Sequence, residues 1–298
     1  MIVVAGATGA LGKGVVKYLA KQKAEVKALV RFHSDVNAIS LLRDWGAIIA
    51  PVDEQNTSSL VKELKGATCV VSAVSGLHEV IVGFQTRLME AASEAGVPKF
   101  IPSDYCIDYT KLPSGNNRNL DYRKEFKEII DKSTLKTTSV LNGMFTDLLL
   151  DKAPVILPAI SRVLCWGNPD QKMDFTTMED TAKYTSFVAL EERTPRFLKV
   201  AGSVASSRDL AATASEVYSK EFKILRPGGL KAFQKLIGVT KFFSPASGEV
   251  FPAWQGMQYL YDMLSGAPKL DKLDNDRYGI IDWTSVKEVL RESKEDQL

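Results

Sequence analysis

A glycine-rich turn directly after the first apolar run constrains the fold of this chain more than any other feature. The run at residues 2–5 has the pattern of a buried strand, and a helical pattern follows at 11–21. The turn between them consists of Gly6, Ala7, Thr8, Gly9, Ala10, Leu11 and Gly12. Glycines allow the tight turn and let the backbone approach a pyrophosphate, while the helix N-terminus attracts its charge. Strand, turn and helix together predict a dinucleotide-binding site.

Strand-like and helix-like segments alternate throughout the first half of the chain. We expect strands at 2–5, 25–30, 47–52, 69–74, 100–103 and 138–141. We expect helices at 11–21, 36–44, 58–64, 80–95 and 122–132. Such alternation is typical of a parallel sheet that is covered by helices on both faces. The predicted fold class is therefore α/β, with a Rossmann-type doubly wound parallel sheet.

The pattern loosens after about residue 150, where proline, glycine and aromatic residues become frequent. Strands are expected at 163–166, 197–200 and 222–226, and helices at 178–191, 207–218 and 254–265. The last helix carries an aromatic and methionine stripe, which suits either a core or the lining of a pocket. We predict an NAD(P)-binding Rossmann domain at 1–150, completed by parts of 163–203. A smaller, partly interleaved C-terminal α/β substrate domain is expected at 151–298.

Composition narrows the classes of partner and cofactor. The 38 basic and 36 acidic side chains give a formal net charge of +2 and form no basic block, so no nucleic-acid partner is expected. The most apolar late stretch, 144–165, is interrupted by charges, so no membrane partner is expected either. Three widely spaced cysteines and two histidines predict reduced thiols, a cytoplasmic location and no metal site.

The end of the second predicted strand indicates which nicotinamide cofactor is bound. Folds that prefer NAD place an acidic residue there, which accepts a hydrogen bond from the ribose 2′-hydroxyl. Here the strand ends on Arg31, whose guanidinium suits a 2′-phosphate. We therefore expect NADP(H) rather than NAD(H). The alternative is that Arg31 is only a surface cation beyond the end of a strand.

The chain resembles a known family, the NmrA-like and isoflavone-reductase-like branch of the atypical short-chain dehydrogenases/reductases. The segments that carry the resemblance are 6–12, 28–31, 85–92, 94–105, 140–145 and 274–279. The most specific part is the middle block, which begins at Gln85 and continues through Ala95-Gly96-Val97 to Pro102-Ser103. The resemblance implies a Rossmann domain, a smaller C-terminal domain and a substrate cleft between them. It also implies that a further set of residues lies near the cofactor: Asp53, Ser72, Ala73, Val74, Ser75, Ser103, Asn142, Gly143, Met144 and Phe145.

The resemblance also bears on the catalytic residue, because reductases of this family carry a lysine at the start of the helix after the fifth strand. A gapless alignment places Arg123 at that position, and Lys124 follows it. A step of one residue turns a side chain by about 100° around a helix, so the two cannot point alike. Either the helix start shifts and Lys124 faces the cleft, or the catalytic lysine is absent. The helix could also simply be charged on its outer face.

Other proton donors have weaker support. The Tyr-x-x-x-Lys pair of typical short-chain dehydrogenases is missing, since Phe126 lies four residues after Tyr122, and Tyr109 lies four residues after Tyr105. Tyr105 and Tyr122 are possible hydroxyl donors that no spacing singles out. Cys106 lacks a neighbouring cation or base and is expected to be buried rather than reactive.

Two functional hypotheses follow from these observations. The first is an NADP(H)-dependent oxidoreductase that transfers hydride to a small apolar carbonyl, quinone or phenylpropanoid-like substrate. The second is a non-catalytic NmrA-like sensor of NAD(P) redox state, which would act through a protein partner. The sequence predicts neither the substrate identity nor the oligomeric state.

Overall fold

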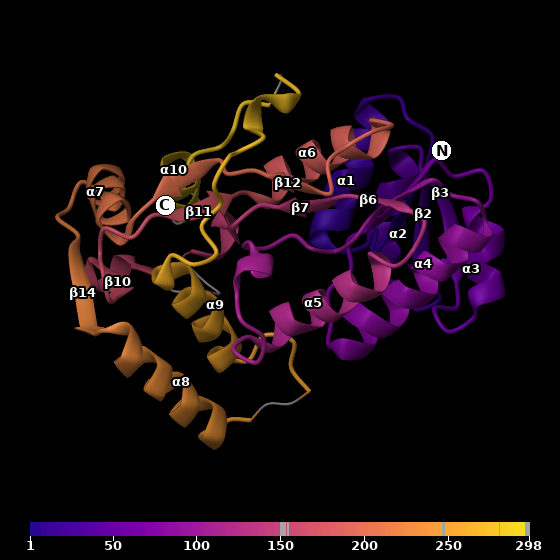
Figure 1. The fold of residues 1–298 in the computed structure, drawn as a ribbon. Helices are drawn as coiled ribbons and strands as arrows, with labels where there is room; N and C mark the ends of the chain where they lie inside the picture. Colours follow the sequence, from indigo (N-terminus) through magenta and orange to yellow (C-terminus); the bar gives the residue numbers. More distant parts are fainter. Residues whose placement is uncertain (150–152, 154, 246–247, 280, 296–298) are drawn as a thin grey trace. The chain divides into compact units, whose positions relative to one another are not determined.

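The computed structural model of this chain describes residues 1–298 except 150–152, 154, 246–247, 280 and 296–298. The chain packs into two compact units (Figure 1). Unit 1 consists of Met1–Tyr105, Asn119–Val140 and Thr181–Leu198. Unit 2 consists of Cys106–Arg118, Leu141–Asp180 and Lys199–Leu298. The predicted functional division at 1–150 and 151–298 stays a prediction, and each unit is described by itself below.

Unit 1 is built on a six-stranded sheet in the order β3-β2-β1-β4-β5-β6. Its strands are β1 (Ile2–Ala5), β2 (Val26–Arg31), β3 (Ile48–Val52), β4 (Cys69–Ser72), β5 (Lys99–Ile101) and β6 (Lys136–Thr137). All five neighbouring pairs are parallel. This strand order is that of the dinucleotide-binding fold. The predicted Rossmann-type doubly wound sheet is therefore confirmed.

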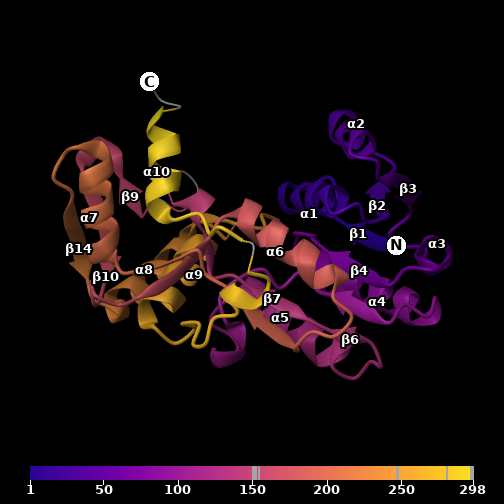
Figure 2. The same ribbon diagram turned by 90° about the horizontal axis from the view of Figure 1, so that it is seen from above.

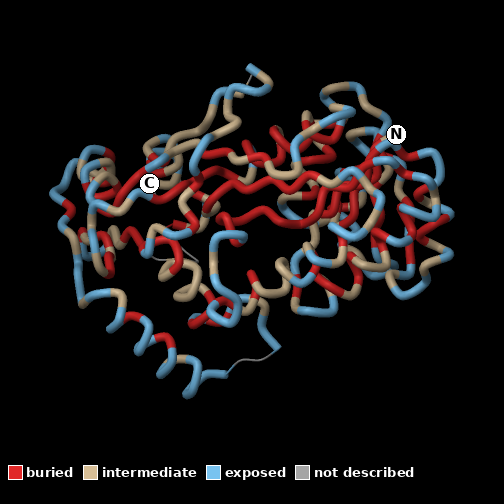
Figure 3. Tube along the Cα trace, in the orientation of Figure 1, coloured by how far each residue is buried: buried red, intermediate tan, exposed pale blue. Residues whose placement is uncertain are grey.

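Helices cover both faces of this sheet, as the alternation predicted. They are α1 (Ala10–Lys21), α2 (Val36–Asp44), α3 (Thr57–Leu64), α4 (Gln85–Glu94), α5 (Arg118–Ile130) and α6 (Met178–Leu190). Figure 2 shows α1 and α2 on one side of the sheet and α3 and α4 on the other. One hydrophobic core joins α3, α4 and α5 to the sheet, with Leu60, Leu88 and Phe126 packed beside Val3 and Phe100. All five of these residues are buried, and Figure 3 shows the strands of the sheet mostly in the red of buried residues.

The segment 138–141 was predicted to be the sixth strand of the parallel sheet, and this prediction was wrong. β6 is Lys136–Thr137, and the predicted residues form β7 (Ser139–Leu141), which pairs with β12 (Phe197–Lys199) in a separate two-stranded sheet. At Ser139 the chain leaves the six-stranded sheet, because the Ser139 N–H donates a hydrogen bond to the Arg196 carbonyl.

Two helices also begin differently from the prediction. A π-helix, Glu79–Phe84, precedes α4, and α5 begins about one turn before residue 122.

Unit 2 contains two small sheets and the α-helices α7 to α10 among its described residues. One sheet has the order β14-β10-β9 and the other β13-β11-β8. The strands are β8 (Met144–Phe145), β9 (Ile156–Leu157), β10 (Arg162–Trp166), β11 (Met173–Thr176), β13 (Ser203–Ala205) and β14 (Lys223–Gly228). The helices are α7 (Ser207–Tyr218), α8 (Leu230–Phe243), α9 (Ala253–Ser265) and α10 (Val286–Glu295). The strands at 163–166 and 222–226 and the helices at 207–218 and 254–265 are confirmed, whereas β11, β13, α8 and α10 were not predicted.

A buried lysine ties the sheet of unit 1 to α6. Lys99 on β5 is only 3% exposed, and its Nζ donates hydrogen bonds to the carbonyls of Val188 (2.5 Å) and Glu191 (2.7 Å). These carbonyls lie at the C-terminal end of α6, where backbone acceptors have no partner within the helix. The ammonium group therefore satisfies acceptors that would otherwise be buried and unpaired.

We expect Lys99→Met to lower the free energy of unfolding by about 2 kcal/mol, because the variant keeps the volume but leaves buried carbonyls unsatisfied. The exposed Lys136 on β6 is a matched control, and Lys136→Met should change stability by less than about 0.5 kcal/mol. Equilibrium unfolding in urea measures both. Equal stability of the two variants would contradict this role for Lys99.

Candidate functional site

The glycine turn is closed by backbone contacts that only glycine permits. Gly6 has a φ of +73°, and a Cβ there would lie 2.5 Å from the Ala73 carbonyl oxygen. A Cβ on Gly12 would lie 2.2 Å from the carbonyl oxygen of Gly6. The N–H of Gly9 donates to that same oxygen at 3.0 Å. The sequence therefore folds into a turn that lies directly on the start of α1.

The start of α1 is suited to bind an anion. Gly9 is its N-cap residue and makes no side-chain capping bond, and the first turn holds no acidic residue. The first amides of a helix have no partner within it and form the positive end of its dipole. No side chain at the cap competes for these amides, so they remain available to a phosphate. The turn thus fits the pyrophosphate of a dinucleotide.

Several predicted cofactor residues lie along one edge of the sheet. Arg31 ends β2, Ser72 ends β4, and Asp53 directly follows β3. Because all these strands are parallel to β1, their carboxyl ends lie at the same edge as the glycine turn. This edge is where open α/β sheets bind ligands.

Arg31 and Asp53 are both exposed at this edge. Backbone contacts hold each residue in place: the Arg31 N–H donates to Ser34 Oγ at 3.0 Å, and Asp53 Oδ1 accepts from the Gln55 N–H at 2.9 Å. Among the described residues, the Arg31 guanidinium forms no ion pair or hydrogen bond. It is therefore free to bind a 2′-phosphate.

The segment Ser72–Ser75 changes from buried to exposed within four residues. The Ser72 hydroxyl is fully buried and has no hydrogen-bond partner among the described residues. The Ala73 N–H bonds to the Ala5 carbonyl at 2.9 Å, which holds this segment beside the glycine turn. The predicted position of Ser72–Ser75 next to the turn is consistent with this bond, and a contact with cofactor stays a prediction.

Ser103 is buried and holds the segment after β4. Its Oγ donates to the Val74 carbonyl at 2.7 Å, and its N–H donates to Gln85 Oε1 at 2.9 Å. Gln85 is itself completely buried and donates to the Ile81 carbonyl at 2.7 Å. Sequence reasoning did not assign a role to Gln85, although this residue begins one of the segments that carry the family resemblance. Its burial depends on a helix and a strand that are distant in sequence.

Residues 142–145 belong to unit 2, so their predicted position near the cofactor stays a prediction. Within that unit Asn142 is buried, and its carbonyl accepts a hydrogen bond from Thr176 Oγ1 at 2.7 Å. Gly143 has a φ of +69°, and a Cβ there would lie 2.2 Å from the Asp174 carbonyl oxygen. Met144 and Phe145 form β8 beside β11. Glycine is therefore required at position 143 by close backbone packing.

The two candidate catalytic residues lie on different faces of α5. Arg123 Nη1 donates to the Asn119 carbonyl at 2.9 Å, on the stripe that also carries the buried Phe126. Lys124 Nζ lies 3.4 Å from Asp121 Oδ1, and its side chain is 16% exposed. Because a helix that follows a parallel strand begins at the carboxyl edge, the first turns of α5 lie at the edge of the glycine turn. Whether either residue is catalytic stays a prediction.

The tyrosines differ in their access to solvent. Tyr105, one of the two possible hydroxyl donors, is only 6% exposed, and burial raises the pKa of its hydroxyl, which makes it a poorer proton donor than an exposed tyrosine. Tyr122 is partly exposed, and its ring packs edge-on against His78 with centroids 5.2 Å apart. His78 Nε2 lies 2.9 Å from Glu125 Oε1, which links the segment after β4 to α5. This contact was not predicted from the sequence.

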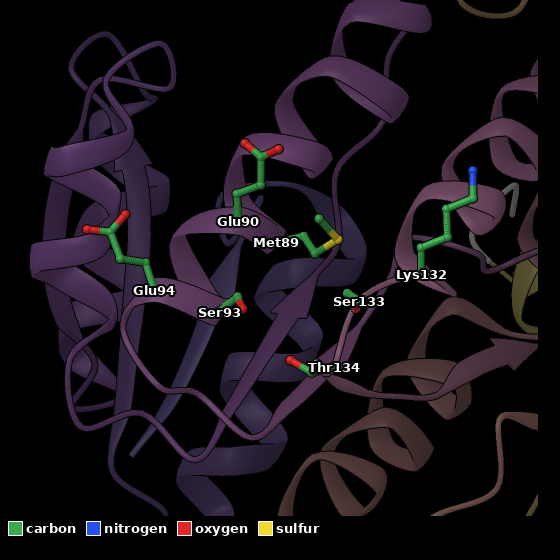
Figure 4. A pocket seen from close by; sticks show the side chains of 7 residues that line it. All are labelled: Met89, Glu90, Ser93, Glu94, Lys132, Ser133 and Thr134. Atoms are coloured by element: carbon green, nitrogen blue, oxygen red, sulfur yellow. The ribbon is translucent and has the colours of Figure 1, made fainter.

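A surface hollow elsewhere in unit 1 contains none of the predicted site residues. It has a volume of about 480 Å³ and is lined by Met89, Glu90, Ser93, Glu94, Lys132, Ser133 and Thr134 (Figure 4). These residues lie at the end of α4 and just before β6. They therefore lie at the amino edge of the sheet, away from the glycine turn.

Cys69, Cys106 and Cys165 are free and buried, and burial raises the pKa of Cys69 to about 12.

No group of three or more His, Cys, Asp or Glu side chains in the described part of the chain could hold a metal ion. Nor does any helix of that part have the length and apolar character needed to cross a bilayer.

Residues 1–255 match the model of the NmrA-like family. The chain belongs to this family. It is 30% identical to pinoresinol reductase 1 of Arabidopsis thaliana over 210 residues, an alignment that spans 65% of each chain and thus slightly less than two thirds of the relative. It is 26% identical to the bifunctional pinoresinol-lariciresinol reductase 1 of Linum usitatissimum over 263 residues, which are 80% of this chain and 84% of the relative.

Solved structures show the same fold at lower identity. AtPrR2 in complex with NADP⁺ and (+)-pinoresinol has a TM-score of 0.82 and 22% identity, covering 98% of this chain and 97% of that chain. Leucoanthocyanidin reductase from Vitis vinifera in complex with NADPH has a TM-score of 0.81 and 17% identity, covering 98% of each chain. The predicted family and fold are confirmed, and the cofactors of these neighbours agree with the prediction of NADP(H).

Proposed function

We propose that this chain is an NADP(H)-dependent reductase acting on a small apolar carbonyl, quinone or phenylpropanoid-like substrate. The observation that carries the proposal is a glycine turn at a helix N-terminus that no side chain caps. On the same edge of the sheet lies Arg31, whose guanidinium has no ion pair or hydrogen bond within the described part of the chain. The named relatives, which are reductases of phenylpropanoid-type lignans, support this substrate class. The three buried thiols are consistent with a reducing, cytoplasmic location.

Different residues of the chain bind the cofactor and assist the chemical step of such a reaction. The nicotinamide supplies hydride when it is bound. The amides at the start of α1 hold the pyrophosphate, and the Arg31 guanidinium binds the 2′-phosphate. Hydride addition to a carbonyl carbon leaves negative charge on the oxygen, which needs a proton or a nearby cation. We assign the proton to the Lys124 ammonium, because arginine stays charged and Arg123 can only stabilise the oxyanion.

The direct test is NADPH oxidation with a broad panel of aldehydes, ketones, quinones and lignans. Turnover with at least one class is expected, together with stoichiometric NADP⁺ formation. Calorimetric titration with NADPH, NADP⁺, NADH and NAD⁺ is carried out on the same preparation. Binding of NADPH without turnover of any panel member would contradict the reductase and favour a redox sensor with a protein partner. A lack of binding to all four nucleotides would contradict the cofactor site itself.

Arg31→Ala is expected to weaken NADPH binding by about 30-fold while leaving NADH binding unchanged. The reason is that a charge-assisted hydrogen bond contributes about 1.5–3 kcal/mol, and only NADPH carries the 2′-phosphate. Arg43→Ala, at an exposed arginine on α2, is the matched control and should change neither affinity. Calorimetry on both variants measures the effect. Equal losses of affinity for NADPH and NADH would show that Arg31 does not bind the 2′-phosphate.

A further inference from the structure

Helix α8 of unit 2 has one buried apolar face and a second apolar face that is exposed. Phe233 and Ile237 form the buried face, where the Phe233 ring stacks on Trp166 with centroids 4.7 Å apart. At the C-terminal end Lys241 Nζ lies 4.9 Å from the centroid of the Trp254 ring on α9. The helix is therefore held against its own unit by one side only. Figure 3 shows most of its length in the colour of exposed residues.

The exposed apolar face follows a helical spacing. Ala232, Leu236, Val239 and Phe243 are separated by four, three and four residues, which places them on one stripe of the helix. Leu236 is 41% exposed, Val239 52% and Phe243 79%. Phe242, also 79% exposed, extends the apolar surface at the end of the helix, where its ring lies 5.2 Å from that of Phe243. We call the stripe together with Phe242 the α8 surface.

The charged residues of α8 itself are all basic. From Leu230 to Phe243 the chain carries Lys231, Lys235 and Lys241, and no Asp or Glu. On the helix, Lys235 lies about 40° from Val239, and Lys231 lies one turn before Lys235, so these two side chains border the apolar stripe, whereas Lys241 packs on Trp254. Lysines in such a position can extend their charged ends towards anionic groups while their carbon chains cover apolar surface.

We propose that the α8 surface binds to anionic phospholipid membranes. Helices that lie in the membrane interface combine a phenylalanine- and leucine-rich face with a lysine-rich border, as this one does. A second copy of the chain is a less suitable occupant, because it would bring two surfaces of like charge together. The earlier expectation of no membrane partner rested on the absence of a spanning segment, and surface attachment needs none. This inference does not depend on the proposed reductase activity.

The test is flotation of the full chain with vesicles of phosphatidylcholine alone and of phosphatidylcholine with phosphatidylserine. The wild type should float with the vesicles that contain phosphatidylserine and be released by added salt, which screens exposed charges. Lys231→Gln/Lys235→Gln should reduce partitioning about tenfold, because each lysine near an anionic surface contributes a several-fold effect. Phe242→Ser/Phe243→Ser should reduce it by at least about tenfold.

Ile160→Ser is the matched control, because Ile160 is 57% exposed in the same unit but lies outside the α8 surface. Thermal unfolding of every variant shows whether the fold is kept. The proposal fails if the wild type does not bind phosphatidylserine vesicles or binds both vesicle types equally. It also fails if folded phenylalanine variants still bind. A dimer in light scattering that the phenylalanine variants dissociate would instead assign the surface to a second copy.

Discussion

Gly12→Ala is expected to weaken NADPH binding about a thousandfold. The new Cβ would lie 2.2 Å from the Gly6 carbonyl oxygen, 2.8 Å from its carbon and 2.9 Å from the Ala7 Cα. All three atoms belong to the backbone, so no side-chain rotation relieves the clash and the turn itself must move. A shifted turn takes its amides away from the pyrophosphate. Each such charge-assisted bond contributes about 1.5–3 kcal/mol, so the loss of two gives this magnitude.

Gly66→Ala provides the control for the backbone strain of a substituted glycine. Gly66 lies between α3 and β4 with a φ of +78°, and a Cβ there would meet nothing within 4 Å. This variant should lose about 1 kcal/mol of stability and keep its NADPH affinity. Calorimetry and urea unfolding are measured on both proteins. If folded Gly12→Ala binds NADPH as tightly as the wild type does, the glycine turn is not the pyrophosphate site.

The parts of the fold that local patterns determine were predictable from the sequence. β1 and the glycine turn follow from a short apolar run and from backbone contacts that only glycine allows. α7 begins and ends at the predicted residues, and the capping box between Ser206 and Asp209 marks its start. α8 was missed because it is apolar on two sides, which hides the single-sided periodicity of a surface helix. The pairing of β7 was missed because it depends on Arg196, far along the chain.

The candidate site was likewise predictable from the sequence only in part. Arg31 was predicted from its place at the end of a strand, whereas Asp53 and Ser72 came from the family resemblance; all three lie at the carboxyl ends of strands in one parallel sheet. Contacts across long sequence distances could not be inferred. The bond from the Ser103 N–H to Gln85 and the pairing of His78 with Glu125 both join separate segments. The burial of Tyr105, which weakens it as a proton donor, is likewise a property of packing and not of spacing.

Lys124→Met is expected to lower kcat about a thousandfold, because positioned general acids contribute about 10² to 10⁴ to a rate. NADPH affinity should not change, since Lys124 is not among the groups assigned to the phosphates. The measurement is kcat with the best substrate of the panel, with NADPH affinity by calorimetry on the same protein. Lys124→Arg keeps the positive charge but cannot give up a proton, so it should recover little of the rate.

Arg123 provides the decisive comparison, because it precedes Lys124 and points about 100° away around the helix. If Lys124 supplies the proton, Arg123→Met should change kcat far less than Lys124→Met does, because Arg123 lies on a different face of α5. If Arg123→Met abolishes turnover and Lys124→Met does not, the assignment is wrong. The chemistry would then depend on a fixed positive charge at residue 123, and the proton would have to come from another donor, of which the partly exposed Tyr122 is the nearest candidate on the same helix.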